Sequence, residues 1–268
     1  MIARAVAALL VVSAALGCSK EPAVAKSDNK FPFVSRKHGV SFDLGADSYT
    51  PNKLGAVGSV GGTVTLEGAI PLATAAVTTD TTLCRTAITS AVQAGTKGAL
   101  SNAVVWIADA KAGKALPIDK RVVISSDNCA IEPRAQTALI GSTVNFFNDD
   151  KAFHRIVFLR AGTDDTLTVM PFFNDGEVVP TEKLAKTSGV VDVRCARHPW
   201  MRGSLVVFDH PYFAVTEKDG RFRLDSLPPG DYRLMVWHEG LSKPIERKIK
   251  VQAGTAGKVD VALKLGAL

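Results

Sequence analysis

The chain has 268 residues, a formal net charge of +6 and a hydrophobic content of 46%. That length can supply one or two domains that each bury a core, and the composition is globular. With four cysteines and five histidines, a dense disulfide scaffold, a zinc-finger array and any site that needs many imidazoles are excluded. A basic balance suits nucleic acid, an anionic membrane surface or an acidic protein partner.

Residues 1–18 are predicted to be a targeting signal. A short basic region at Arg4 precedes an apolar run over residues 5–16, which is too short to span a bilayer. The run ends in Ala-Leu-Gly-Cys18, which resembles a bacterial lipoprotein signal in which Cys18 is acylated; a plain secretory signal is the alternative. A lipoprotein signal predicts a protein that is lipid-anchored to a membrane in the bacterial periplasm or cell envelope. A plain secretory signal predicts a secreted protein. Export argues against nucleic acid as a partner.

Residues 19–55 are predicted to be a tether, because no hydrophobic period is sustained in them. Phe31, Phe33 and Phe42 favour packing of part of this segment on the folded body.

The rest of the chain is predicted to be all-β. Short alternating or β-branched runs recur between Gly and Pro turns, which is typical of sandwiches and barrels. These runs are residues 62–68, 103–107, 122–124, 142–147, 155–159, 189–193, 204–208, 221–224, 232–237, 246–251 and 258–264. Two helical stretches, around residues 82–94 and 181–185, are too small to organise a helical domain.

The segment after the run 189–193 carries the sharpest chemical signal. Cys195, His198 and Met201 stand there at C-x2-H-x2-M spacing, and His154 follows an earlier strand after a polar loop. A thiolate, two imidazoles and a weak thioether make the ligand set of a type 1 copper site. The alternatives are a fold that has lost its metal and a Met201 that only packs in the core.

Residues 122–208 resemble the cupredoxin family. The resemblance rests on the stretch 141–150, on His154 and on the metal-binding loop, in which Pro199 follows the second histidine as in amicyanin. It implies a Greek-key β-sandwich over residues 119–208.

The resemblance also implies one type 1 copper ion, bound by two imidazole nitrogens, a cysteine sulfur and an axial thioether. These ligands are His154, His198, Cys195 and Met201. Arg155 departs from the family, which often has an asparagine there that helps to tie the ligand loops together. The departure puts the residues that support the ligands in doubt, not the ligands themselves.

The remaining cysteines favour a disulfide. Cys18 belongs to the signal and Cys195 to the metal-binding loop, which leaves Cys84 and Cys129 in an oxidising compartment. A Cys84–Cys129 disulfide is therefore predicted, and two buried free thiols are the alternative.

The C-terminal segment, residues 209–268, has its own turn chemistry. Asp219-Gly220 is a hairpin signal, and the run Leu-Pro-Pro-Gly230 is a rigid reversal. The stretch 213–232 resembles the carboxypeptidase-regulatory-like family, which implies a transthyretin-like β-sandwich.

That sandwich needs more strands than residues 209–268 supply. Residues 61–72 and 100–107, within the N-terminal β-region 56–118, look like the opening strands of the same family. We therefore expect a discontinuous domain with the cupredoxin-like part inserted into it. Two consecutive sandwiches are the alternative.

His210 and His238 are predicted to belong to a hydrogen-bond network in the core of the C-terminal domain. A second metal site, completed by Asp209 and Glu239, is the weaker interpretation, because spacing alone does not argue for it.

The favoured function is that of an exported one-electron carrier. The resemblance implies that His198 lies near the surface, beside a docking patch formed by Arg194, Arg197, Trp200 and Arg202. Exposed basic charge would steer an acidic redox protein, such as a cytochrome or a reductase, to this patch.

Two other classes of function are alternatives. A non-redox envelope-binding, structural or copper-storage protein would use the same scaffold without electron transfer. A copper enzyme is disfavoured, because a second copper site needs more histidines than His38, His210 and His238 can supply in their scattered contexts.

Overall fold

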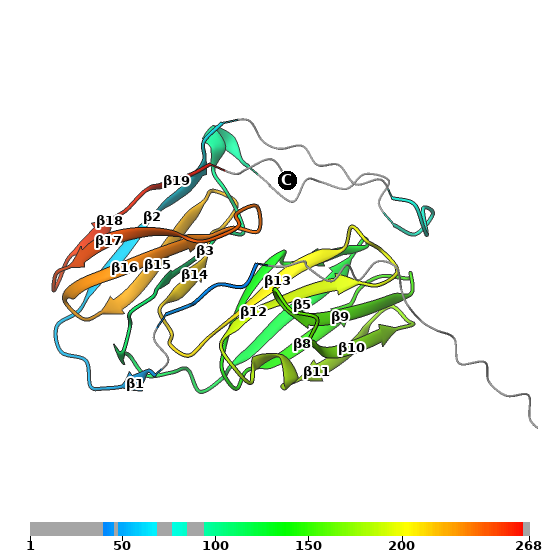
Figure 1. The fold of residues 1–268 in the computed structure, drawn as a ribbon, viewed down its shortest axis with the longest axis horizontal. Helices are drawn as coiled ribbons and strands as arrows, with labels where there is room; N and C mark the ends of the chain where they lie inside the picture. Colours follow the sequence, from blue (N-terminus) through cyan, green and yellow to red (C-terminus); the bar gives the residue numbers. More distant parts are fainter. Residues whose placement is uncertain (1–39, 46–47, 69–76, 85–93, 265–268) are drawn as a thin grey trace, which may run out of the picture. The chain divides into compact units, whose positions relative to one another are not determined.

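The computed structural model describes residues 40–45, 48–68, 77–84 and 94–264 (Figure 1). Regular structure in this part of the chain consists of β-strands and two short 3-10 helices, so the predicted all-β class is confirmed. None of its helices is long and apolar enough to cross a membrane. The predicted signal and Cys18 lie outside the described residues.

The central part of the chain folds into two sheets that enclose one apolar core. Strands run β10-β9-β12-β13-β7 in one sheet and β11-β8-β5-β6 in the other. In the first sheet the strands are β10 Thr166–Phe172, β9 His154–Arg160, β12 Gly189–Cys195, β13 Arg202–Phe208 and β7 Ala135–Leu139. In the second they are β11 Glu177–Thr181, β8 Thr143–Asn148, β5 Arg121–Asp127 and β6 Ala130–Glu132. The core includes Phe146, Phe158 and Phe172, all fully buried.

Strand β8 shows how the sequence pattern builds this core. Val144, Phe146 and Asn148 alternate with more exposed residues, so all three face inward. The first two supply apolar volume. Asn148 brings a buried amide to the end of the strand, where it must find hydrogen-bond partners.

A second set of strands joins segments from both ends of the described chain. One sheet has the order β14-β3-β16-β17, and the other has β15-β2-β18 with β19 also on β2. The first contains β14 Phe213–Val215, β3 Val104–Ile107, β16 Gly230–Trp237 and β17 Ile245–Val251. The second contains β15 Arg221–Leu227, β2 Gly58–Leu66, β18 Ala256–Lys258 and β19 Val261–Leu263.

The pairing of β2 and β3 is that of a discontinuous domain. Strand β2 pairs with β15, with Thr63 opposite Arg221, and β3 pairs with β16, with Trp106 opposite Met235. The chain therefore starts this domain, forms the central sandwich, and then returns to complete the domain it began. Two consecutive sandwiches would not produce these pairs.

The expectation of a tether is wrong for residues 40–45 and 48–55. Phe42 stacks on Trp106 with ring centroids 5.6 Å apart, and the Trp106 indole donates a 2.8 Å hydrogen bond to the Leu44 carbonyl. Strand β1, Thr50–Pro51, pairs in parallel with β4, Ala112–Gly113. Residues 19–39 lie outside the described part of the chain.

The structure describes the two stretches that are predicted to be helical to different extents. Residues 181–185 contain a single 3-10 turn, Lys183–Ala185, and the other short 3-10 helix is Thr96–Gly98. Of the stretch 82–94, residues 82–84 form a turn and residues 85–93 are not described.

Both C-terminal histidines are buried and accept backbone hydrogen bonds. Nδ1 of His210 accepts from the Tyr212 amide at 3.2 Å, and Nδ1 of His238 accepts from the Gly240 amide at 3.1 Å. Within the described residues, the cluster that could hold a metal includes neither of them. These contacts support the structural interpretation of both side chains.

These histidines predict acid sensitivity. Burial lowers the pKa of His210 and of His238 to about 4 in each case. Because an unfolded histidine binds its proton near pH 6.5, stability is unaffected above about pH 6.5 and falls as the pH drops from there towards about 4. We expect a loss of roughly 3 kcal/mol per histidine at about pH 4, measured by urea unfolding across this range. His238→Gln should flatten the dependence, and an unchanged slope would contradict this account.

Candidate metal centre

The metal-binding loop joins β12 to β13 and is closed by its own backbone. The Met201 amide donates to the His198 carbonyl at 2.9 Å, and the Cys195 amide donates to the Met201 carbonyl at 3.2 Å. The Ala196 amide also donates to the Arg155 carbonyl at 2.8 Å, which ties the loop to β9. Since β9 begins at His154, this bond brings the distant histidine to the loop.

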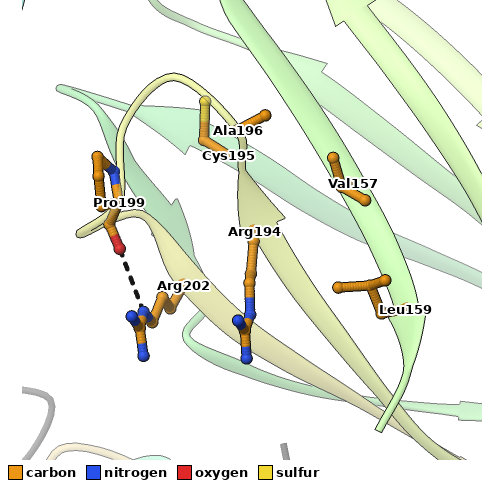
Figure 2. Close-up of a pocket in the computed structure, with 7 residues that line it drawn as sticks. All are labelled: Val157, Leu159, Arg194, Cys195, Ala196, Pro199 and Arg202. Atoms are coloured by element: carbon orange, nitrogen blue, oxygen red, sulfur yellow. Dashed lines mark hydrogen bonds between the residues drawn. The ribbon is translucent and has the colours of Figure 1, made fainter. Parts of the chain in front are cut away.

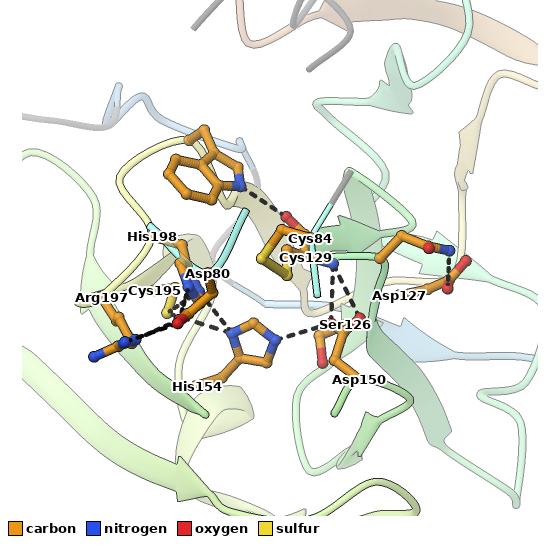
Figure 3. Close-up of a disulfide and its surroundings, with 12 residues drawn as sticks. Asp80, Cys84, Ser126, Asp127, Cys129, Asp150, His154, Cys195, Arg197 and His198 are labelled. Carbon is orange, nitrogen blue, oxygen red and sulfur yellow. Dashed lines mark hydrogen bonds and ion pairs between the residues drawn. A yellow bond between two sulfur atoms is a disulfide. The ribbon is translucent and has the colours of Figure 1, made fainter. Parts of the chain in front are cut away.

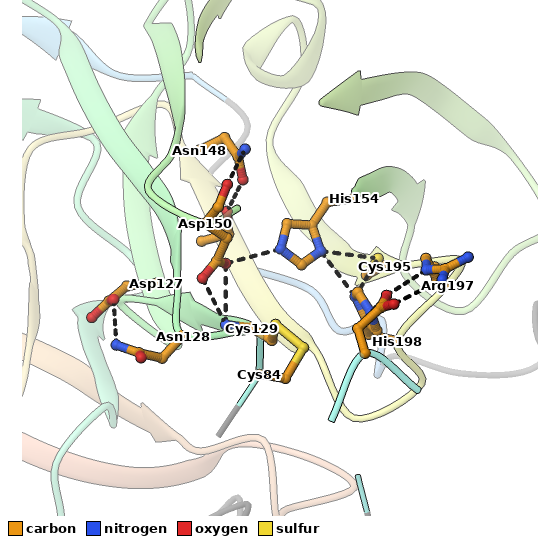
Figure 4. A network of polar contacts seen from close by, with 12 residues as sticks. Cys84, Asp127, Asn128, Cys129, Asn148, Asp150, His154, Cys195, Arg197 and His198 are labelled. Carbon is orange, nitrogen blue, oxygen red and sulfur yellow. Dashed lines mark hydrogen bonds and ion pairs between the residues drawn. A yellow bond between two sulfur atoms is a disulfide. The ribbon is translucent and has the colours of Figure 1, made fainter. Parts of the chain in front are cut away.

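Three donor atoms converge at this point (Figure 4). Sγ of Cys195 lies 3.7 Å from Nδ1 of His154 and 3.6 Å from Nδ1 of His198, and the two nitrogens are 2.9 Å apart. A point equidistant from atoms with these separations lies about 2.0 Å from each, which is close to metal–imidazole bond lengths in proteins. The three side chains therefore fit a single bound ion.

Burial separates this cluster from solvent. Cys195 is 3% exposed, and His154 and His198 are 0% exposed. Met201 is 1% exposed and lies in the same apolar core as Cys195. The structure thus brings all four predicted ligand residues to one end of the sandwich.

A carboxylate holds the far nitrogen of each histidine. Nε2 of His154 lies 2.9 Å from Oδ2 of Asp150, and Nε2 of His198 lies 2.9 Å from Oδ2 of Asp80. A carboxylate can only accept, so each Nε2 donates to its carboxylate, and each Nδ1, which faces Cys195, is the nitrogen that would bind a metal. The two carboxylates therefore fix the orientation of each ring.

The site is charged even without a metal. Burial acts to lower the pKa of His154, but its hydrogen bonds to Asp150 and Cys195 outweigh burial and raise the pKa to about 9. Burial acts to raise the pKa of Cys195, but hydrogen bonds from the two histidines lower it to about 6. A thiolate is therefore available at neutral pH, and the thiolate is the form of cysteine that binds metals.

Asn148 and Asp150 provide support that the sequence analysis missed. Both Asp150 oxygens accept from the Cys129 amide, at 3.0 and 3.1 Å. The Asn148 amide donates to the Asp150 carbonyl at 3.0 Å and its oxygen accepts from the Ser126 hydroxyl at 2.7 Å. This network holds the loop before His154. The signal available in the sequence was a polar run ending three residues before that histidine.

A disulfide joins Cys84 to Cys129 beside the cluster, with Cα atoms 5.2 Å apart (Figure 3). Sγ of Cys129 also lies within 4.8 Å of ligand nitrogens of His154 and His198. Because that sulfur is bonded to Cys84, it is not a thiolate. Cys195 is the free cysteine among the described residues, so we assign the sulfur ligand to it.

The expected docking patch is wrong for two of its members. Arg194 is 7% exposed and pairs with Asp192. Trp200 is 7% exposed, and its indole donates a 3.0 Å hydrogen bond to the Cys129 carbonyl. Arg194 and Trp200, which the loop sequence suggested for an exposed docking surface, are therefore buried and make their contacts within the fold.

His198, expected near the surface, is itself fully buried. Its outer edge is covered by Asp80, which also pairs with Arg197, so the Arg197 charge is compensated. Arg202 stays exposed and donates to the Pro199 carbonyl at 3.1 Å (Figure 2). The pocket drawn there, which Cys195 helps to line, has a volume of about 30 Å³, room for about one water.

Comparisons with known proteins give one family match and several structural ones. The carboxypeptidase regulatory-like domain family matches residues 202–264, and no curated protein matches the chain. A reduced mutant of amicyanin is 22% identical over 34% of this chain and 86% of its own, with a TM-score of 0.29.

Two further solved structures are similar over the same share of the chain. Auracyanin from the photosynthetic bacterium Roseiflexus castenholzii is 18% identical over 34% of this chain and 99% of its own, with a TM-score of 0.30. A purple cupredoxin from Nitrosopumilus maritimus is 22% identical over 34% of this chain and 100% of its own, with a TM-score of 0.28.

The chain therefore combines two kinds of domain. Its sheets and its Cys/His/His/Met cluster, consistent with a type 1 copper site, make the central part cupredoxin-like. The family match identifies a carboxypeptidase regulatory-like domain at the C-terminal end. The family match confirms the resemblance that the sequence shows in this C-terminal segment.

Proposed function

We propose that the protein binds one copper ion in a type 1 site and carries single electrons. The observation that carries the proposal is the triangle formed by one sulfur and two Nδ1 atoms, which suits an ion at metal-bonding distance. Copper would supply a one-electron couple between Cu(I) and Cu(II). His154, His198 and Cys195 would bind it, and Met201 would supply a weak thioether ligand.

The chain's contribution is to fix the positions of these ligand groups and to exclude water from them. The closed loop and the two carboxylates restrict both imidazoles, so the ligands are arranged before a metal arrives. Burial excludes water from the donor atoms. Limited rearrangement between oxidation states is what a one-electron carrier requires.

A second candidate function is copper storage or a non-redox structural role. The closed edge of His198 favours it, because neither His154 nor His198 exposes an imidazole edge to a redox partner. Reversible one-electron cycling distinguishes the two functions, since a storage or structural site does not need it.

The proposal also covers the redox partner and the cellular location of the protein. We propose an exported protein of the bacterial periplasm or envelope, lipid-anchored through Cys18, with an acidic cytochrome or reductase as its partner. The chain's net charge of +6 and the exposed Arg202 support the choice of an acidic partner.

The test is addition of Cu(II) to the purified chain with a visible spectrum and a potentiometric titration. We expect an intense thiolate-to-copper band that is lost on reduction and regained on oxidation. Cys195→Ser should abolish the band, and His198→Gln should weaken or abolish it. His238→Gln is the matched control, because that histidine is equally buried but lies outside the cluster. A colourless wild-type protein would refute the copper assignment.

A further inference from the structure

The segment Val77–Cys84, called here the Asp80 segment, places a carboxylate on the outer edge of His198 (Figure 3). It is far from the metal-binding loop in sequence, since Asp80 and His198 are 118 residues apart. Oδ2 of Asp80 lies 2.9 Å from Nε2 of His198, on the side of the ring opposite the converging donor atoms. This contact explains why His198 is completely buried although it lies on a loop.

Three independent contacts hold Asp80 in place. The Arg197 guanidinium binds both carboxylate oxygens, with Nε to Oδ2 at 2.6 Å and Nη2 to Oδ1 at 2.9 Å. The amides of Leu83 and Cys84 both donate to the Asp80 carbonyl at 2.8 Å, which closes a tight turn. The disulfide to Cys129 then fixes the end of that turn to the sandwich.

The backbone of Asp80 is also adapted to this position. Its φ is +52°, in the left-handed region that most side chains avoid and that aspartate tolerates better than most. The turn, the disulfide and the bidentate ion pair together orient the Asp80 carboxylate towards Nε2 of His198. A solvated surface aspartate would need none of them.

We propose that Asp80 is a positioning residue for the metal centre, which orients His198 and closes its edge to solvent and to external ligands. Arg197 holds the carboxylate, and the Cys84–Cys129 disulfide tethers the segment that carries it. The inference rests on the proposed copper function for its chemistry. Its geometric part, the orientation of His198, concerns only residues of this chain.

Two consequences follow for a bound ion. An imidazole that donates to a carboxylate is a better electron donor through its other nitrogen, so Asp80 strengthens metal binding. Its negative charge also favours the more highly charged Cu(II) over Cu(I), so Asp80 lowers the reduction potential.

The test compares Asp80→Asn and Asp80→Ala with Asp119→Asn. Asp119 is the matched control, because it also binds two guanidinium nitrogens of an arginine, Arg121, but is highly exposed. In copper-loaded protein we expect Asp80→Asn to raise the reduction potential and to weaken copper binding by about 10- to 100-fold. Asp80→Ala should also let added imidazole change the visible spectrum. Asp119→Asn should leave all three measurements as in the wild type.

A metal-free readout separates this inference from the proposed function. In nitrogen NMR of the wild-type apoprotein, Nε2 of His198 should be protonated and hydrogen-bonded, and Asp80→Ala should remove that hydrogen bond. If the wild type takes up no copper, the proposed function fails and the NMR result still decides the role of Asp80. If copper binds normally, Asp80→Asn changes neither potential nor affinity, and Asp80→Ala leaves the Nε2 signal of His198 unchanged, Asp80 has a purely structural role and the inference is overturned.

Discussion

Replacing both Cys84 and Cys129 with serine is expected to lower the free energy of unfolding by about 4 kcal/mol. The two cysteines are 45 residues apart, and opening a crosslink over a loop of that length increases the entropy of the unfolded chain by about this amount. The native chain gains nothing in return, because its strands already fix the position of Cys129. Urea unfolding of the metal-free protein, wild type against double variant, measures the difference.

The same double variant tests which sulfur binds copper. Cys129 lies close enough to both histidines to be considered, but Cys195 is the free thiol. We expect the double variant to keep the thiolate-to-copper band that Cys195→Ser loses. A band that disappears with the disulfide and survives Cys195→Ser would reverse the assignment. Equal unfolding midpoints for double variant and wild type would show that the crosslink does not stabilise the fold.

The ligands could be predicted from sequence because they depend on short-range spacing. Cys195, His198 and Met201 share one loop, and a turn between two strands must bring them together whatever surrounds it. The strands themselves could be predicted from alternation, as in β8, where inward and outward residues change at every position.

The residues around the ligands could not be predicted in the same way. Asp80 reaches His198 across 118 residues, and no local pattern marks it. For the same reason the loop sequence alone suggested an exposed basic patch. Arg194 and Trp200 do have the composition of a docking surface, but Arg194 forms a buried ion pair with Asp192 and Trp200 donates to the Cys129 carbonyl. Whether a polar side chain is exposed depends on partners that other segments supply.

The discontinuous domain could be anticipated only as one of two alternatives, and one glycine tests it sharply. A Cβ built at Gly62 in β2 would lie 1.8 Å from the Val259 carbonyl oxygen, which belongs to the C-terminal segment. Backbone cannot move aside as the end of a flexible side chain can. We therefore expect Gly62→Ala to lower the free energy of unfolding by at least about 3 kcal/mol, measured by urea unfolding.

The location of the damage distinguishes the two domain arrangements. Because β2 pairs with β15 and with β18, hydrogen exchange in Gly62→Ala should become faster in these C-terminal strands, while β9 and β12 stay protected. Gly257→Ala is the matched control, since a Cβ on that β18 residue meets nothing closer than 3.6 Å and should change stability little. If Gly62→Ala were as stable as this control, or if exchange rose only within the central sandwich, residues 58–66 would not belong with the C-terminal strands. The split domain would then have to be abandoned, and the central sandwich would no longer be an insertion.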